Sequence, residues 1–240
     1  MSENVAITAT RLGKTFAMGK QSVAALRDVS LTLPAGTLTA LTGPSGSGKS
    51  TLLHLIAGLE RVDSGTLEVL GHPVHTCGQA ELAALRLREI GFVHQDFSLL
   101  ADLTLLENVR LPLEATGTAR NDATTAACEA MARVGLTGLE QRFPAEVSGG
   151  QQQRAAIARA IVGRRTLVLA DEPTGSLDSK TGAEIMGVLA QLRDEGVTVV
   201  LSTHNPANLS HADQVAVLHD GTLLSFDAAE SAESAEGGVA

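Results

Sequence analysis

The stretch Leu38-Thr-Ala-Leu-Thr42-Gly43-Pro-Ser-Gly-Ser-Gly48-Lys49-Ser50 predicts the centre of the fold. Its first five residues have the composition of a buried strand, and the residues that follow, Ser50–Ala57, have the pattern of a helix. Between them, Gly43 to Ser50 match the pattern G-x-x-x-x-G-K-[ST] without a mismatch. A glycine-rich turn between a strand and a helix is the setting in which this pattern forms a phosphate-binding loop.

Each constrained position of the loop has a physical reason. The glycines let backbone N–H groups turn toward a phosphate, and the helix N-terminus adds the positive end of its dipole. We expect the Lys49 ammonium to reach the β- and γ-phosphates of a nucleotide, and the Ser50 hydroxyl to ligate Mg²⁺. Rough residue frequencies give under about one chance match in a hundred chains of this length, which disfavours a fortuitous loop.

A pair of carboxylates follows a second apolar strand, predicted at Thr166–Ala170. Because ligands of open α/β sheets collect at the carboxyl ends of the strands, Asp171 is predicted to hold Mg²⁺ and Glu172 to act as general base toward water. A solvated strand end is the simpler interpretation of the pair by itself. The phosphate loop in the same domain favours the site.

The remaining strand patterns predict an α/β fold, a P-loop NTPase core with a mainly parallel sheet. Further core strands are expected at Ile90–His94 and Val197–Ser202. Short strands around Val5–Thr10, Ser30–Leu33 and Thr66–Leu70 predict an N-terminal antiparallel β subdomain.

A different pattern begins after the strand at Ile90–His94. Over about 96–161 the strand signals vanish, and Ala-rich stretches at Ala123–Val134 and Gln151–Ile161 predict an inserted α-helical subdomain. We therefore expect one nucleotide-binding domain over residues 1–227 and a disordered tail over residues 228–240.

Composition limits the partners. The chain has 240 residues, of which 44% are hydrophobic, enough for a sizeable core. A formal charge of −9 and an aromatic content of 2% disfavour nucleic acid. Cys77 and Cys128 show no metal or redox spacing, which indicates a reduced, intracellular setting. No signal peptide or membrane-spanning stretch is apparent, so we expect any membrane anchor to lie in another subunit.

A second anion-binding device is predicted at Ser148-Gly-Gly-Gln151, a turn before a helix. One nucleotide does not need two such devices unless they come together. The simplest resolution is a head-to-tail dimer, in which each ATP lies between the phosphate loop of one chain and this turn of the other. Gln95 and His204 stand at predicted strand ends, where each by itself would be an ordinary polar residue.

Taken in order, these motifs resemble those of the ATP-binding subunit of ABC (ATP-binding cassette) transporters, over nearly the whole chain. Gly43–Thr51 resembles the Walker A loop and Leu167–Glu172 resembles Walker B. Val147–Gln151 is similar to the LSGGQ signature, with Val147 for the usual Leu, and Ser176–Asp178 resembles the D-loop.

The resemblance implies roles for single residues. Gln95 is the glutamine that touches Mg²⁺ and the attacking water, and His204 is the switch histidine. Phe16 is the candidate for stacking on adenine in place of the usual Tyr, with an ordinary packed hydrophobe as an equal alternative. The implied ATP-binding residues are Phe16, Gly43, Pro44, Ser45, Gly46, Ser47, Gly48, Lys49, Ser50, Thr51, Ser148, Gly149, Gly150, Gln151 and Asp178; the implied catalytic residues are Glu172, His204 and Gln95; and the implied Mg²⁺ ligands are Ser50, Gln95 and Asp171.

Ala170–Gly182 and Glu107–Leu113 further resemble the group that includes macrolide exporters, lipoprotein-release ATPases, antimicrobial-peptide resistance pumps and a cell-division ATPase. This implies an ATPase that powers a separate integral membrane permease, which exports or extracts a cargo, at the inner face of the cell membrane. The alternative is a regulatory or force-transmitting ATPase that moves no cargo. A ribosomal or DNA-repair ATPase is disfavoured, because neither a second cassette nor a long coiled coil is present.

Four apolar residues in the segment from Gln95 to Leu113 are too numerous for a freely solvated loop. We expect this segment to carry the partner surface, with packing of the helical subdomain as the alternative. The four residues are Phe97, Leu99, Leu100 and Leu103.

Overall fold

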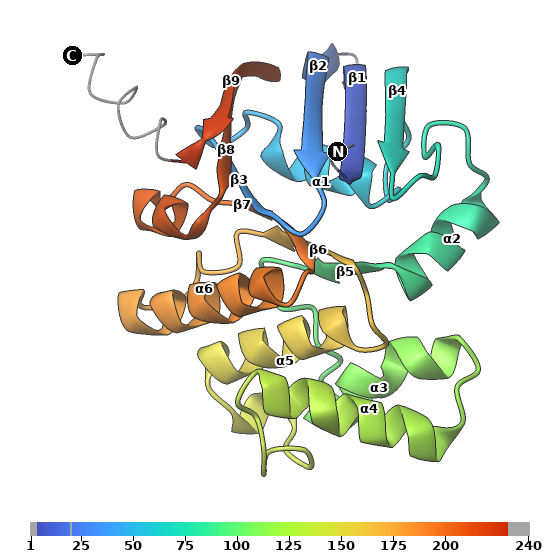
Figure 1. Ribbon diagram of the computed structural model, residues 1–240, viewed down its shortest axis with the longest axis vertical. Coiled ribbons are helices and arrows are strands. Elements are labelled where there is room, and N and C mark those ends of the chain that lie inside the picture. Colours follow the sequence, from blue (N-terminus) through green and yellow to red (C-terminus); the bar gives the residue numbers. More distant parts are fainter. Residues whose placement is uncertain (1–3, 20, 230–240) are drawn as a thin grey trace.

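The computed structural model describes residues 4–19 and 21–229 (Figure 1). The tail expected at 228–240 lies outside the described residues from residue 230 onward, and Ala228 is the last residue of a strand.

Two sheets organise the chain. The antiparallel sheet has the order β2-β1-β4 and contains β1 (Val5–Met18), β2 (Gln21–Pro34) and β4 (Ser64–Val69). The larger sheet has the order β5-β6-β7-β3-β8-β9, parallel except for the antiparallel pair β8-β9. Its strands are β3 (Leu38–Thr42), β5 (Ile90–Val93), β6 (Leu167–Asp171), β7 (Thr198–Ser202), β8 (Gln214–His219) and β9 (Thr222–Ala228).

The helices divide between the sheets and a separate helical layer. Figure 1 shows β1, β2 and β4 at one end of the molecule with β8 and β9 beside them, β5, β6 and β7 in the middle, and α3, α4 and α5 at the other end. The helices are α1 (Lys49–Ile56), α2 (Gln79–Arg88), α3 (Leu105–Ala115), α4 (Arg120–Arg133), α5 (Gly149–Ile161) and α6 (Ser179–Asp194), with short 3-10 helices η1 (Pro144–Glu146) and η2 (Pro206–His211).

Two apolar cores pack on opposite faces of the larger sheet. Neighbours in β6 show the division, because Leu169 belongs to one core and Val168 to the other, as alternation along a strand requires. The core around Leu169 includes β1, β2, β4 and α1, and the core around Val168 includes α3, α4, α5 and α6. The inner strands are thus buried on both faces, as is typical of parallel strands between layers.

The predicted fold class is confirmed, and some element bounds are corrected. The first two strands run far beyond the short stretches expected. The prediction was too short because the β1–β2 pairing contains register shifts between Ala9 and Lys14, which interrupt the alternation of apolar and polar residues. The strands β8 and β9 and the helix α2 were not predicted. Within residues 96–161, the described chain contains helices and turns but no strand.

Candidate active site

The phosphate loop joins β3 to α1, and its glycines differ in how much space surrounds a Cβ atom at each position. A Cβ on Gly43 would lie 2.0 Å from the carbonyl oxygen of Leu218, and a Cβ on Gly48 would lie 2.6 Å from that of Ala25. Both glycines have positive φ, 138° and 103°, so the fold itself requires them. Gly46 has no atom within 4 Å of its Cβ position and faces open space.

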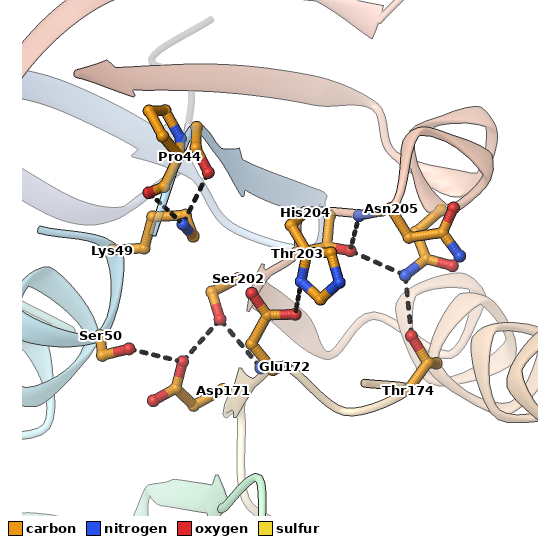
Figure 2. A network of polar contacts seen from close by, with 12 residues as sticks. Pro44, Lys49, Ser50, Asp171, Glu172, Thr174, Ser202, Thr203, His204 and Asn205 are labelled. Carbon is orange, nitrogen blue, oxygen red and sulfur yellow. Dashed lines mark hydrogen bonds and ion pairs between the residues drawn. The ribbon is translucent and has the colours of Figure 1, made fainter. Parts of the chain in front are cut away.

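Lys49 is held at the mouth of this loop. The residue is only 7% exposed. The ammonium donates to the carbonyl oxygens of Gly43, at 2.7 Å, and Pro44, at 3.0 Å (Figure 2). Among the described residues, no carboxylate forms an ion pair with Lys49. A buried cation without a carboxylate partner suits an anionic ligand.

Asp171 ends β6 and faces the start of α1. The Ser50 hydroxyl donates to Asp171 Oδ1 at 2.9 Å, and the Ser202 hydroxyl donates to the same oxygen at 2.6 Å (Figure 2). The predicted pair Ser50 and Asp171 is thus brought together. Hydroxyl and carboxylate oxygens are ligands that suit Mg²⁺. The described chain holds no group of three or more His, Cys, Asp or Glu side chains that could bind a metal by themselves.

Glu172 contacts His204 across the sheet edge. Nδ1 of His204 lies 2.8 Å from Glu172 Oε2, so this nitrogen carries the proton that an ionised carboxylate accepts. The Glu172 side chain is 15% exposed, whereas that of His204 is 64% exposed. Glu172 has a left-handed backbone with φ of 48°, which costs roughly 1–2 kcal/mol for a residue with a Cβ. Its backbone N–H donates to Ser202 Oγ at 2.9 Å, which helps hold this conformation.

Strand register gathers the predicted residues at one edge. Val93 pairs with Ala170, and Ser202 pairs with both Asp171 and Leu41, so the carboxyl ends of β5, β6, β7 and β3 meet. Gln95 and His204 each lie two residues beyond the end of a strand rather than at its last residue. Gln95 is exposed, and its side chain forms no hydrogen bond within the described chain.

The turn at Ser148–Gln151 begins α5 in the helical layer. Ser148 Oγ accepts from Gln151 N at 3.3 Å, and Gln151 Oε1 accepts from Ser148 N at 2.9 Å, which forms a capping box. A Cβ on Gly150 would lie 2.4 Å from Thr181 Cγ2, but a Cβ on Gly149 would meet no atom closer than 3.7 Å. No hydrogen bond between described residues joins this turn to the phosphate loop.

Asp178 and Phe16 have local contacts, and their roles at a nucleotide stay predictions. Asp178 caps α6, because its carboxylate accepts from Thr181 Oγ1 at 2.6 Å and from two backbone N–H groups. Hydrogen bonds from the Thr181 side chain and backbone lower the pKa of Asp178. Phe16 is half-buried on β1, with the Lys14 ammonium 5.0 Å from its ring centroid.

Two polar residues at the sheet edge were not predicted. Ser202 is fully buried and contacts both Asp171 and Glu172. Asn208 is also buried, and its amide donates to the Thr174 and Thr203 hydroxyls at 2.9 Å each, which joins the loops after β6 and β7. The sequence signal for Ser202 was its position as the last residue of a buried apolar strand.

The apolar residues expected at a partner surface differ in their exposure. Phe97 and Leu99 pack against the core, whereas Leu100 is 51% exposed. In the described part of the chain, no helix combines the length and hydropathy needed to cross a membrane.

Comparisons with known proteins agree with this geometry. Residues 26–175 match the family described as ABC transporter. The chain is 40% identical over 226 residues to the macrolide export ATP-binding/permease protein MacB of Salmonella choleraesuis (strain SC-B67). That alignment covers 94% of this chain and 35% of the relative, so the chain spans about a third of the length of the curated relatives that it matches.

Solved structures give the same result. The dimeric structure of MJ0796, described as a bacterial ABC transporter cassette, superposes with a TM-score of 0.86 at 37% identity and covers 93% of this chain and 98% of that one. A post-hydrolysis dimer of MJ0796 bound to ADP and Pi also gives a TM-score of 0.86, at 36% identity over the same shares of both chains. The chain therefore belongs to the ABC transporter family, as an ATP-binding cassette.

Proposed function

We propose that this chain hydrolyses ATP·Mg²⁺ at a site shared by two copies and thereby drives a membrane permease that exports or extracts a cargo. The permease would hold it at the inner face of the cell membrane. The observation that carries the proposal is the continuous hydrogen-bonded set Ser50–Asp171–Ser202, with Glu172 and His204 at the same sheet edge as Lys49.

Binding is assigned first to the phosphate loop. Backbone N–H groups from Gly43 to Thr51 and the Lys49 ammonium would bind the β- and γ-phosphates. Ser50 and Asp171, whose oxygens lie 2.9 Å apart, would hold Mg²⁺ together with Gln95. When bound, Mg²⁺ neutralises charge on the phosphates.

Glu172 would accept a proton from the attacking water. Its backbone is held by the Ser202 hydroxyl, and its Oε2 accepts from His204 Nδ1, so one carboxylate oxygen is fixed while the other remains available. Since proton transfer requires a base within hydrogen-bond reach, this orientation is what a general base needs. His204 would keep the carboxylate in place and, being largely exposed, could contact the γ-phosphate.

The turn at Ser148–Gln151 would complete the site from the second copy. Support comes from Gly149, which has no steric requirement in its own chain, and from the exposed position of Ser148. The MJ0796 cassette is dimeric in both solved structures and is bound to ADP and Pi in one of them, which supports a site formed by two copies. The second copy would lie head to tail, so that each phosphate loop faces the partner's turn.

Mixed dimers test the shared site. A dimer of Lys49→Ala chains has two damaged loops, and a dimer of Ser148→Arg chains has two damaged turns. A mixed dimer has one site with both defects and one intact site, so it should retain about one ATP per dimer when both chains also carry Glu172→Gln. If loop and turn served one ATP within a single chain, mixing would restore nothing. Retention no better than in either parent dimer would contradict the head-to-tail arrangement.

The permease would dock in a groove between the larger sheet and the helical layer. Apolar side chains of Leu59, Phe92 and Leu111 line it, and Leu59 is 45% exposed. Three guanidinium groups and one imidazole also line the groove, with no carboxylate: Arg86, Arg159, Arg165 and His94. A short apolar segment that carries an acidic residue fits this combination of surface and charge.

Charge substitution on the groove tests docking. Leu59→Glu should weaken co-purification with the permease while the isolated chain keeps its ATPase activity. The matched control is Leu224→Glu on β9, because Leu224 is 64% exposed and lies outside the groove. Leu100→Glu tests the segment expected from the sequence. Loss of folding in Leu100→Glu would favour packing of the helical subdomain for that residue.

A further inference from the structure

The segment Gln95–Ser98 has a strained backbone that its own sequence does not explain. Phe97 and Ser98 are consecutive non-glycine residues with φ of 62° and 48°. Each such residue costs roughly 1–2 kcal/mol, and conformations of this kind persist only where the surroundings impose them. A local bond from Ser98 Oγ to Asp96 Oδ1, at 2.7 Å, contributes to the turn.

The guanidinium group of Arg159, on α5, binds the backbone of this turn. Arg159 donates from one terminal nitrogen to the carbonyl oxygen of Ser98 at 2.7 Å and from the other to that of Phe97 at 2.9 Å. The planar fork of arginine thereby engages both strained residues at once. Burial lowers the pKa of Arg159, and Asp96 opposes that shift in part.

A second contact fastens the segment to the beginning of the same helix. A Cβ on Gly149 would lie 3.8 Å from Cζ of Phe97, so the Phe97 ring reaches the first turn of α5. Gly149 and Arg159 are separated by about 15 Å of helix at 1.5 Å per residue. Phe97 is therefore held twice by α5, through its ring beside Gly149 and through its carbonyl oxygen by Arg159.

We propose that Arg159 is a positioning residue that couples the two ATP sites of the dimer. This inference rests on the proposed function, in which Gln95 serves the ATP bound by its own chain and Ser148–Gln151 serves the ATP bound by the partner. Through Arg159 and Phe97, Gln95 and the turn at Ser148 belong to one rigid unit. A displacement of Gln95 by the first ATP is then transmitted to the turn that completes the second site.

The experiment compares variants of the full chain by steady-state ATPase activity against ATP concentration. Arg159→Met keeps the apolar stem and removes both donors. We expect the Hill coefficient to fall to about one and kcat to fall by roughly tenfold, a typical size for coupling between sites, with ATP affinity of the monomer unchanged. Arg159→Lys, which keeps the charge and donors, should restore part of the coupling.

Arg154→Met is the matched control. Arg154 lies on the same helix, but it donates to the Val134 carbonyl and to Glu184, with no contact to the Gln95–Ser98 segment. It should retain the cooperativity of the wild type. An equal loss in Arg154→Met, or an unchanged Hill coefficient and kcat in Arg159→Met, would overturn the coupling role.

Phe97→Leu serves if Arg159→Met does not fold, because it keeps an apolar side chain and removes Cζ, the ring atom that reaches Gly149. It should lower the Hill coefficient as well, and an unchanged value would overturn the proposal. A wild-type chain that hydrolyses ATP without cooperativity would overturn the coupling and leave the proposed function standing. A wild-type chain without ATPase activity would overturn both.

Discussion

The phosphate loop and the turn at Ser148–Gln151 use the same device in different ways. Both are glycine-containing turns that lead into a helix N-terminus. In the loop, Gly43 and Gly48 are required by close backbone atoms of the same chain, and Lys49 is buried, with its ammonium on the Gly43 and Pro44 carbonyl oxygens. In the turn, Ser148 is exposed, and Gly149 has ordinary space around it.

The comparison distinguishes glycines that the fold itself requires from a glycine that a ligand or a partner chain would require. A glycine with no room for a methyl group is explained by its own chain. A glycine with room for a methyl group, such as Gly149, is not explained by packing within its own chain. This contrast agrees with the proposed site, in which the phosphate loop acts within one copy and the turn at Ser148–Gln151 faces a second copy.

The largest effect on ATP turnover is expected at Glu172, which lies at the same sheet edge as the phosphate loop. Glu172→Gln should keep ATP binding, because the amide has nearly the same shape, but it removes the proton acceptor. General-base loss typically costs roughly 10²–10⁴-fold in turnover. ATPase rate and ATP retention, measured on the same preparation, check this, and the variant should accumulate as an ATP-bound dimer. A near-normal rate would end the assignment of Glu172 as base.

Lys49→Ala should have the next largest effect, on binding itself. A hydrogen bond to a charged group is worth roughly 1.5–3 kcal/mol, so affinity for ATP should fall about ten- to a hundredfold. Titration with a labelled ATP analogue measures it. Arg88→Ala, an exposed cation on α2, is the control and should bind as the wild type does. Unchanged binding in Lys49→Ala would contradict the loop assignment.

The sequence predicts best where the pattern is local. The loop is bounded by β3, a short buried run, and by α1, whose helical pattern is visible in one segment, and its eight-residue motif is contiguous. By contrast, the bulges in β1 break the alternation on which strand prediction depends. The short apolar run of β8 gave no prediction, and β9 pairs only with β8 and lies at the sheet edge.

The polar contacts that hold the candidate site could not be predicted, because they join distant parts of the chain. Arg159 contacts Ser98 across 61 positions, and Ser202 contacts Asp171 across 31. Asn108 lies within a motif that the sequence comparison with the family had singled out. Its full burial and its bonds to the Leu100, Leu103 and Thr104 carbonyls, which shape the loop before α3, required the structure.

Gly150→Ala should have a smaller effect, on stability. The new methyl group would lie 2.4 Å from Thr181 Cγ2, and Thr181 cannot rotate freely because its hydroxyl donates to Asp178. Overpacking of this kind costs about 1–3 kcal/mol in free energy of unfolding. Thr181→Ser removes Cγ2 and keeps the hydroxyl, so the double variant should recover most of the loss. Denaturant unfolding measures both, and no recovery would show that the contact with Thr181 is not the cause.

The smallest effect on stability is expected at the neighbouring Gly149. The Gly149→Ala variant therefore tests the turn at Ser148–Gln151 without a loss of stability. In Gly149→Ala, the methyl group would lie 3.7 Å from Leu177 Cδ2 and 3.8 Å from Phe97 Cζ, which are ordinary contacts. Replacing glycine by alanine at an unstrained position stabilises by about 0.4–1 kcal/mol, so the free energy of unfolding should be unchanged or slightly raised.

The same methyl group would occupy space at the helix N-terminus that the partner's ATP needs in the proposed site, so ATP-dependent dimerisation should fall. Sedimentation with ATP on a Glu172→Gln background measures the dimer, and denaturant unfolding measures the monomer. A destabilised monomer would mean that the chain itself requires Gly149, and an undiminished dimer would mean that the turn does not face the partner's nucleotide.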